Sequence, residues 1–285
     1  MGTIKTKGII IAENNMDDFD KMLTMITPGM GKIACAAKGA RRPKSLLLGG
    51  TQFLCFGEYV LYKGGETYNI NSCEPIEVFY NIRVDLDKLK YAVHITKIMN
   101  DVVQENQNCY RILQLFLNTL YVISEKNMNL DLVLAIFKMK LLSMIGYMPN
   151  VRECGNCKSK ENINNFSFKY NGFLCDTCAK QDTGALHISE NTKYAIQYIT
   201  MSEPKKIFSF NMPECDLKEL QIISKIYFNE KMEKEYKIEE LFWKVEFCRN
   251  LFCQFVSQNL ILSIMLWYNI NINLQGRRSL YGTRN

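Results

Sequence analysis

Residues 6–38, TKGIIIAENNMDDFDKMLTMITPGMGKIACAAK, alternate short runs rich in β-branched residues with turn residues. Two further runs, TQFLCFGEYVLYK (51–63) and TYNINSCEPIEVF (67–79), continue this pattern after the breaks GARRPKS and KGGE. Five short strands with no helix long enough to cover a parallel sheet favour a small antiparallel barrel. The five-stranded OB-fold is the leading candidate for this part of the chain.

The pattern becomes helical after residue 80. Apolar residues recur at helical spacing in segments 81–103, 109–124 and 130–149, and the third segment ends in Gly146 and Pro149, an expected stop signal. Two more helices are predicted in segments 189–201 and 215–230, the last opening with an Asp-x-x-Glu cap at Asp216 and Glu219. The predicted fold class is therefore α+β, with a barrel followed by a helical domain.

Changes in composition divide the chain further. From Phe242 an apolar run of nine residues passes into an Asn-rich stretch, which offers little to a packed core. We expect five parts: an OB-fold nucleic-acid-binding domain (1–80), a first helical part (81–150), a cysteine module (151–181), a second helical part (182–250) and an atypical tail (251–285).

Four of the eleven cysteines form two Cys-x-x-Cys pairs separated by seventeen residues. The pairs are Cys154 with Cys157 and Cys175 with Cys178, a spacing typical of one structural zinc ion held by four thiolates. The alternatives are two redox motifs or chance clustering, and His187 is a less favoured substitute ligand. The remaining cysteines are interpreted mostly as small core residues: Cys35, Cys55, Cys73, Cys109, Cys215, Cys248 and Cys253.

A basic loop is predicted between two strands of the barrel. No acidic residue occurs from Lys21 to Gly57, a stretch that also carries Lys32, Lys38, Arg41, Arg42 and Lys44. A cationic loop on a small barrel is suited to nucleic-acid phosphates, with aromatic residues of the next strand (Phe53, Phe56, Tyr59 and Tyr62) as candidate stacking surfaces. A solvated charged loop is the alternative, and the sequence does not decide between the two.

Several functional classes are disfavoured by the sequence. PGMGKIA carries Gly31-Lys32, but Ile33 stands where a phosphate-binding loop needs Ser or Thr. The two histidines, His94 and His187, have no catalytic signature nearby. No run reaches the length of a secretory or membrane segment, so we expect a protein of the cytoplasm. Because the sequence shows no catalytic set, we also expect that the protein is not an enzyme.

Taken in order, five segments resemble the RecO family of bacterial recombination mediators. They are GKIACAAKGARRPKS (31–45), NIRVDLDKLKYA (81–92), FKMKLLSMIGYMP (137–149), FSFKYNGFLCDTC (166–178) and GALHIS (184–189). The resemblance implies an OB-fold, a helical domain and a zinc module. It implies DNA contacts at Lys32, Lys38, Arg41, Arg42 and Lys44, and zinc ligands at Cys154, Cys157, Cys175 and Cys178. The segment from Phe242 departs from the basic, leucine-containing helix with which family members usually end.

The resemblance also implies an activity and its partners. RecO-like proteins bind single- and double-stranded DNA, anneal complementary strands, and act with RecR to load RecA onto DNA coated by single-stranded-DNA-binding protein. We therefore expect a DNA-binding and annealing protein of recombinational repair, associated with the bacterial nucleoid. The rival hypothesis is a zinc-stabilised scaffold whose partners are proteins. If the basic loop is only a solvated face, the DNA surface is expected around Arg83, Lys88 and Lys90.

Overall fold

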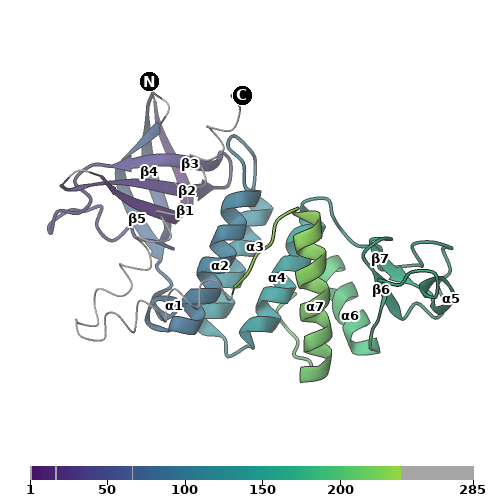
Figure 1. The fold of residues 1–285 in the computed structure, drawn as a ribbon. Helices are drawn as coiled ribbons and strands as arrows, with labels where there is room; N and C mark the ends of the chain where they lie inside the picture. The colour runs from purple at the N-terminus through teal and green to yellow at the C-terminus, as the bar shows by residue number, and fades with distance from the viewer. Residues whose placement is uncertain (1, 17, 66, 239–285) are drawn as a thin grey trace, which may run out of the picture. The chain divides into compact units, whose positions relative to one another are not determined.

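The computed structural model describes residues 2–16, 18–65 and 67–238 (Figure 1). The described chain falls into two compact units, the first ending at Leu113 and the second covering Gln114–Tyr236. Strands dominate the first unit and helices the second, which confirms the predicted α+β class. The predicted tail (251–285) and the altered segment from Phe242 lie outside the described residues.

The first unit contains a closed barrel of five strands: β1 (Thr3–Met16), β2 (Asp20–Thr27), β3 (Gly31–Ala37), β4 (Phe56–Gly64) and β5 (Thr67–Glu77). The strands follow one another around the barrel in the order β1-β2-β3-β5-β4. Four of the five pairings are antiparallel, and the barrel closes through a short parallel pairing of β3 with β5. The predicted five-stranded, OB-like barrel is thus confirmed.

One strand begins later than predicted. Residues 51–55 form turns, and β4 starts only at Phe56. Leu54 has a φ of 60°, which no regular strand accommodates, and its N–H donates to the carbonyl oxygen of Ile10 on β1. The apolar character of this segment reflects burial against the barrel and not a place in the sheet.

The predicted first helix is divided in two. α1 (Tyr80–Val84) and α2 (Leu86–Val102) are separated by Asp85, whose extended backbone ends one helix while its carboxylate accepts hydrogen bonds from the N–H groups of Asp87 and Lys88. α3 (Tyr110–Glu125) follows, and the boundary between the two units falls within it.

In the second unit, α4 (Leu130–Met144), α6 (Glu190–Met201) and α7 (Glu214–Lys231) pack against one another. α4 ends before Gly146, whose φ of +100° fits the predicted stop signal. The buried Lys140 of α4 donates from Nζ to the carbonyl oxygens of Thr200 and Ser202 at the C-terminal end of α6, where a cation is electrostatically favoured. Among the described residues, no helix has both the length and the apolar character to cross a bilayer.

The segment between α4 and α6 carries the small elements of the cysteine module. These are β6 (Asn165–Ser167), β7 (Gly172–Leu174), the short α5 (Asp176–Ala179) and β8 (Leu186–His187). The three strands form an antiparallel sheet in the order β7-β6-β8. Phe166 on β6 meets Tyr227 of α7 edge to face at 5.5 Å, so the sheet packs on the helices through an aromatic contact.

The spacing of Asp216 and Glu219 predicted a cap at the start of α7, and this prediction is wrong, because the N-cap residue of α7 is Pro213. Asp216 accepts hydrogen bonds from Ser189 Oγ and Asn191 Nδ2, both at 2.7 Å. Glu219 accepts the backbone N–H of Ser189 at 3.0 Å. Both carboxylates therefore support the N-terminal end of α6, where negative charge is favoured. The hydrogen bonds from Asn191 and Ser189 hold the pKa of Asp216 below its ordinary value.

Replacing Asp216 with Ala should lower the free energy of unfolding by about 1–3 kcal/mol at neutral pH, because the Ser189 hydroxyl and the Asn191 amide lose a charged acceptor. A lowered folded-state pKa means that this stabilisation is complete above the unfolded-state value of about 4 and is lost as pH falls through the folded-state pKa. Urea unfolding of wild type, Asp216→Ala and the non-titrating Asp216→Asn from pH 7 to pH 3 should show the wild-type advantage narrowing at the acid end. An advantage that does not change with pH would contradict a role for the charge.

Candidate metal centre and nucleic-acid interface

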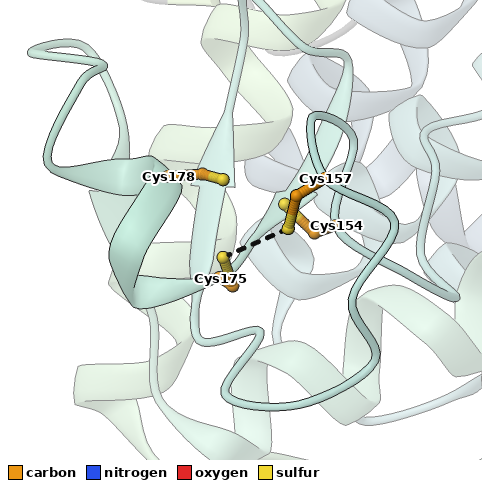
Figure 2. Close-up of side chains that lie close together, drawn as sticks. All are labelled: Cys154, Cys157, Cys175 and Cys178. Atoms are coloured by element: carbon orange, nitrogen blue, oxygen red, sulfur yellow. Dashed lines mark hydrogen bonds between the residues drawn. The ribbon is translucent and has the colours of Figure 1, made fainter.

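The four paired cysteines converge on one point (Figure 2). Cys154 and Cys157 lie in the loop after α4, Cys175 precedes the first turn of α5, and Cys178 lies within α5. All four sulfur atoms lie within 4.8 Å of one another, and the Sγ atoms of Cys157 and Cys175 are 3.7 Å apart. A tetrahedron with metal–sulfur bonds of about 2.3 Å has edges of about 3.8 Å. The four thiols therefore fit a four-coordinate, closed metal site.

Backbone hydrogen bonds shape the loop that carries the first pair. The N–H of Cys154 donates to Ser159 O at 2.7 Å, and the N–H of Gly155 donates to Phe173 O at 2.8 Å. A Cβ at Gly155 would lie 3.0 Å from Tyr170 O, so the close approach of loop and hairpin favours glycine there. Asn156 Nδ2 donates to Cys178 Sγ at 3.4 Å and links the two halves of the cluster.

The electrostatics of the cluster differ from thiol to thiol. Burial raises the pKa of Cys154, but hydrogen bonds from backbone N–H groups, led by that of Cys157, outweigh it and lower the pKa to about 6. The Asn156 side chain lowers the pKa of Cys178, but the neighbouring sulfurs and burial raise it to about 12. Four sulfurs this close cannot all be thiolates without a compensating cation, and a divalent ion would supply that charge.

The hairpin beneath the cluster depends on Gly172. Its φ is +152°, a region that residues with a side chain rarely adopt, and an added Cβ would lie 2.2 Å from Asn150 O. The turn of the hairpin covers residues 168–171. Gly172 follows this turn as the first residue of β7, where it pairs with Ser167 of β6. His187 lies in β8, where it pairs with Asn165 of β6, and it is not among the clustered ligand groups.

The other described cysteines lie mostly in the core, as expected. Cys35, Cys55 and Cys109 are buried and Cys73 is half-buried, but Cys215 is exposed in the first turn of α7. Burial raises the pKa of Cys35 to about 12, which keeps that thiol protonated and inert. Cys248 and Cys253 lie outside the described residues.

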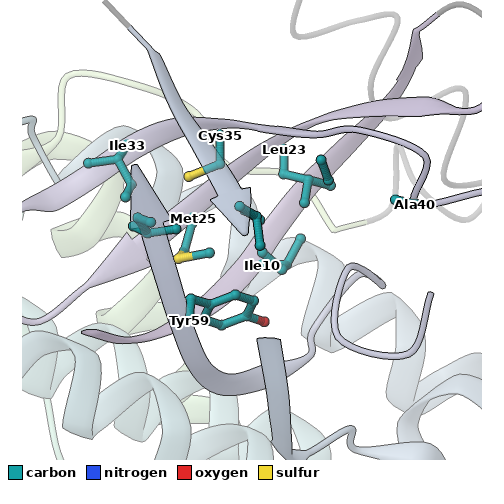
Figure 3. Close-up of a cluster of buried hydrophobic side chains, with 10 residues drawn as sticks. Ile10, Leu23, Met25, Ile33, Cys35, Ala40 and Tyr59 are labelled. Atoms are coloured by element: carbon teal, nitrogen blue, oxygen red, sulfur yellow. The ribbon is translucent and has the colours of Figure 1, made fainter. Parts of the chain in front are cut away.

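Hydrophobic side chains fill the interior of the barrel, and Ala40 from the segment between β3 and β4 is among them (Figure 3). Tyr59 is fully buried beside Ile10, Leu23 and Met25, and its hydroxyl donates to Gly50 O at 2.8 Å, with Cys55 O at 3.2 Å. Of the aromatic residues considered for stacking, Tyr59 and Phe53 are thus core residues, whereas Phe56 and Tyr62 are half-buried.

The basic loop, residues 38–45, leaves β3 and carries four exposed cations: Lys38, Arg41, Arg42 and Lys44. Its backbone is bound to the β1–β2 turn. The N–H of Gly39 donates to Asp20 Oδ1 at 2.7 Å, and the N–H of Arg41 donates to Phe19 O at 3.0 Å. The four cations therefore lie on one loop, and hydrogen bonds at Gly39 and Arg41 fix the backbone of its first half.

Two other cations of the acid-free stretch have partners inside the first unit. Lys21 Nζ lies 2.7 Å from Glu13 Oε2 in a largely buried ion pair, because β1 and β2 are neighbours. Lys32 Nζ donates to Asn100 O at 2.7 Å in the last turn of α2. A stretch without acidic residues in sequence is thus not free of acceptors in space.

The basic loop has an aromatic partner that the sequence did not indicate. The guanidinium carbon of Arg42 lies 5.5 Å from the centroid of the Phe19 ring, and Phe19 is 45% exposed. A cation–π contact of this kind at an exposed site contributes about 0.5–1 kcal/mol. Phe19 and Arg42 are separated by two strands, so only the barrel topology brings them together.

The alternative basic surface is less accessible. Arg83 donates from its guanidinium to Gln52 Oε1 and to Phe53 O, and burial lowers its pKa. This side chain binds the end of the β3–β4 segment to α1. Lys88 and Lys90, in the first turns of α2, are both half-buried and also have interaction partners.

Comparison with known proteins gives consistent results along the chain. The family model described as "Recombination protein O N terminal" matches residues 1–79, and "Recombination protein O C terminal" matches residues 83–239. The DNA repair protein RecO of Acetivibrio thermocellus is 46% identical over 237 residues, which cover 83% of this chain and 94% of the relative. The protein of the same name from Alkaliphilus metalliredigens is 33% identical over 205 residues, covering 72% of this chain and 83% of the relative.

Replacing Gly172 with Ala should lower the free energy of unfolding of the cysteine module by about 1–3 kcal/mol. The new Cβ would clash with the backbone of Asn150, and alanine would be strained at the φ of this position. Gly184→Ala is the matched control: an added Cβ there makes only an ordinary contact with Asp182, and we expect a change within about 0.5 kcal/mol. Thermal unfolding measures both. Equal stability of the two variants would show that the hairpin can relax around position 172.

Proposed function

This chain belongs to the RecO family of DNA repair proteins, and from that premise we propose that it binds DNA through the basic loop of its barrel and anneals complementary strands. The observation that carries the proposal is the group of four exposed cations, Lys38, Arg41, Arg42 and Lys44, on a loop held to an OB-like barrel. Lysine and arginine on such a surface neutralise phosphates and release counterions, which drives binding without reading bases.

Annealing by this surface needs no catalytic group. Two complementary strands repel each other through their phosphates, and a cationic loop that contacts both lowers this repulsion and raises their local concentration. Base stacking and pairing then complete the reaction. Lys32 has a different role in this proposal, because its ammonium donates to Asn100 O and so connects β3 to the end of α2.

The wider role follows from family membership. We assign to this protein assistance to RecA loading on single-stranded DNA together with RecR, in the presence of single-stranded-DNA-binding protein, at the bacterial nucleoid. The rival hypothesis, a zinc-stabilised scaffold that binds only proteins, makes a different prediction about salt. Only direct phosphate contacts require that DNA affinity fall steeply as salt concentration rises.

We assign the four-cysteine cluster to one structural zinc ion. Four sulfur ligands leave no position for water, so the ion would stabilise the module and take no part in a reaction. Three short strands and a helix of four residues bury little apolar surface, and a metal would compensate for this small core.

Protein purified without added metal should contain about one zinc ion per chain by elemental analysis. Cys175→Ser should lose the ion and unfold the module locally, while the barrel keeps its own core and its transition. Cys215→Ser, at an exposed cysteine outside the cluster, is the matched control and should retain the metal. Metal-free wild-type protein with four freely titratable thiols in the module would contradict the assignment.

Changing Arg41, Arg42 and Lys44 together to Ala should weaken binding to single-stranded DNA and flatten its salt dependence. Each lost phosphate contact removes about 0.7 from the slope of log affinity against log salt, so three contacts remove about 2. Fluorescence anisotropy with a short oligonucleotide at several salt concentrations measures this slope. The loss should be similar for different base sequences.

The control removes the same charge elsewhere. Lys180→Ala, Lys205→Ala and Lys206→Ala together eliminate three exposed cations of the second unit. For this variant, we expect the slope of log affinity against log salt to differ from that of wild type by no more than about 0.7, the value of one phosphate contact. Both variants should have the melting temperature of wild type. An unchanged slope in the loop variant, or an equal loss in the control, would show that the basic loop is not the principal DNA contact.

A further inference from the structure

The contact between Phe19 and Arg42 lies outside the hydrophobic core of the barrel. Phe19 lies in the turn between β1 and β2, outside the barrel core, and 45% of its surface remains exposed. The guanidinium carbon of Arg42 lies over this ring, 5.5 Å from its centroid. A rigid aromatic face beside a planar cation is the combination on which unpaired bases stack.

The pair is held in place before any ligand arrives. The carbonyl of Phe19 accepts the N–H of Arg41 at 3.0 Å, and the carboxylate of the adjacent Asp20 accepts the N–H of Gly39 at 2.7 Å. The N–H of Arg42 in turn donates to Gly39 O at 3.1 Å. The backbone segments that carry the ring and the guanidinium are therefore bound to each other, so stacking there requires little additional ordering of the backbone.

The position of Phe19 agrees with the way OB-folds hold oligonucleotides, since the turn between the first two strands is one of their ligand-contacting loops. The exposed carboxylate of Asp18 precedes Phe19 and disfavours a phosphate beside the ring. The cations that favour phosphates lie across the contact, on the basic loop. Base and phosphate would thus be bound by different parts of one surface.

We infer that Phe19, supported by Arg42, is a stacking platform for an unpaired base of single-stranded DNA. This inference rests on the proposed DNA binding and deepens it, because it names the form of DNA that the site prefers. A base within a duplex is already stacked on both faces and cannot reach the ring. A base of a single strand can, and it adds a contact to those made by its phosphates.

The test compares two ligands with the same phosphates. One is a thymidine oligonucleotide of about 15 nucleotides, within the site size of an OB-fold. The other is an abasic strand of equal length. Wild-type protein should bind the thymidine strand about tenfold more tightly than the abasic strand. Phe19→Leu, which keeps an apolar side chain but no ring, should lose this difference by weakening only the thymidine complex.

Two further variants complete the design. Phe19→Trp should restore or increase the preference for the thymidine strand, and the fluorescence of the new indole should be quenched on binding that strand alone. Tyr80→Leu removes another exposed aromatic residue of the first unit, 66% exposed on α1, and should leave both affinities unchanged. The salt slope of Phe19→Leu should equal that of wild type, since no cation is removed.

The possible results distinguish the stacking role of Phe19 from the proposed DNA binding itself. Wild-type protein that binds both strands equally and in a salt-dependent manner retains the proposed DNA binding but overturns the stacking role. The same role is overturned if Phe19→Leu keeps the wild-type preference, or if it weakens both complexes equally. Failure of wild-type protein to bind either strand would remove the proposed function and this inference together.

Discussion

Closure of the barrel depends on a parallel pairing of β3 with β5 that joins Cys35 to Tyr68 and Ala36 to Asn69. The other four pairings are antiparallel, and three of them (β1 with β2, β2 with β3, and β4 with β5) join strands that are consecutive in the chain. The pairings of β1 with β4 and of β3 with β5 join strands that are not consecutive, and the second of these is parallel. Closing the sheet removes its edges and gives its inward side chains one common interior. Because β3 ends at Ala37, directly after this pairing, the start of the basic loop is determined by where the barrel closes.

The second unit meets the problem of a small core in another way. Its helices bury apolar faces against one another, but the three-stranded sheet between α4 and α6 has few residues to bury. Phe166 of this sheet reaches Tyr227 of α7. The four sulfurs draw the loop after α4 toward α5. Aromatic packing and metal coordination would each supply part of the cohesion that a larger sheet obtains from area alone.

Much of this organisation is local in sequence, and that part could be predicted. The five strands, the helix end at Gly146 and the spacing of Cys154, Cys157, Cys175 and Cys178 each express a constraint acting over a few residues. What the sequence did not indicate are bonds between distant segments. Asp216 has the sequence spacing of a helix cap, yet it lies in the first turn of α7 and its carboxylate binds the start of α6. Lys21 and Lys32 lie in an acid-free stretch of sequence, yet they bind Glu13 and Asn100. Phe19 showed no signal at all, since its significance comes from Arg42 lying across the β1–β2 turn.

The segment from β3 to β4 is fastened by its backbone, and this has a consequence for how the family can diversify. Tyr59 holds the carbonyl of Gly50, Lys21 approaches that of Thr51 at 3.3 Å, and Asp20 holds the amide of Gly39. None of these bonds involves the side chains of the outward-facing cations. Substitutions among those cations therefore leave the path of the chain unchanged, and selection can adjust their number one residue at a time without passing through poorly folded intermediates.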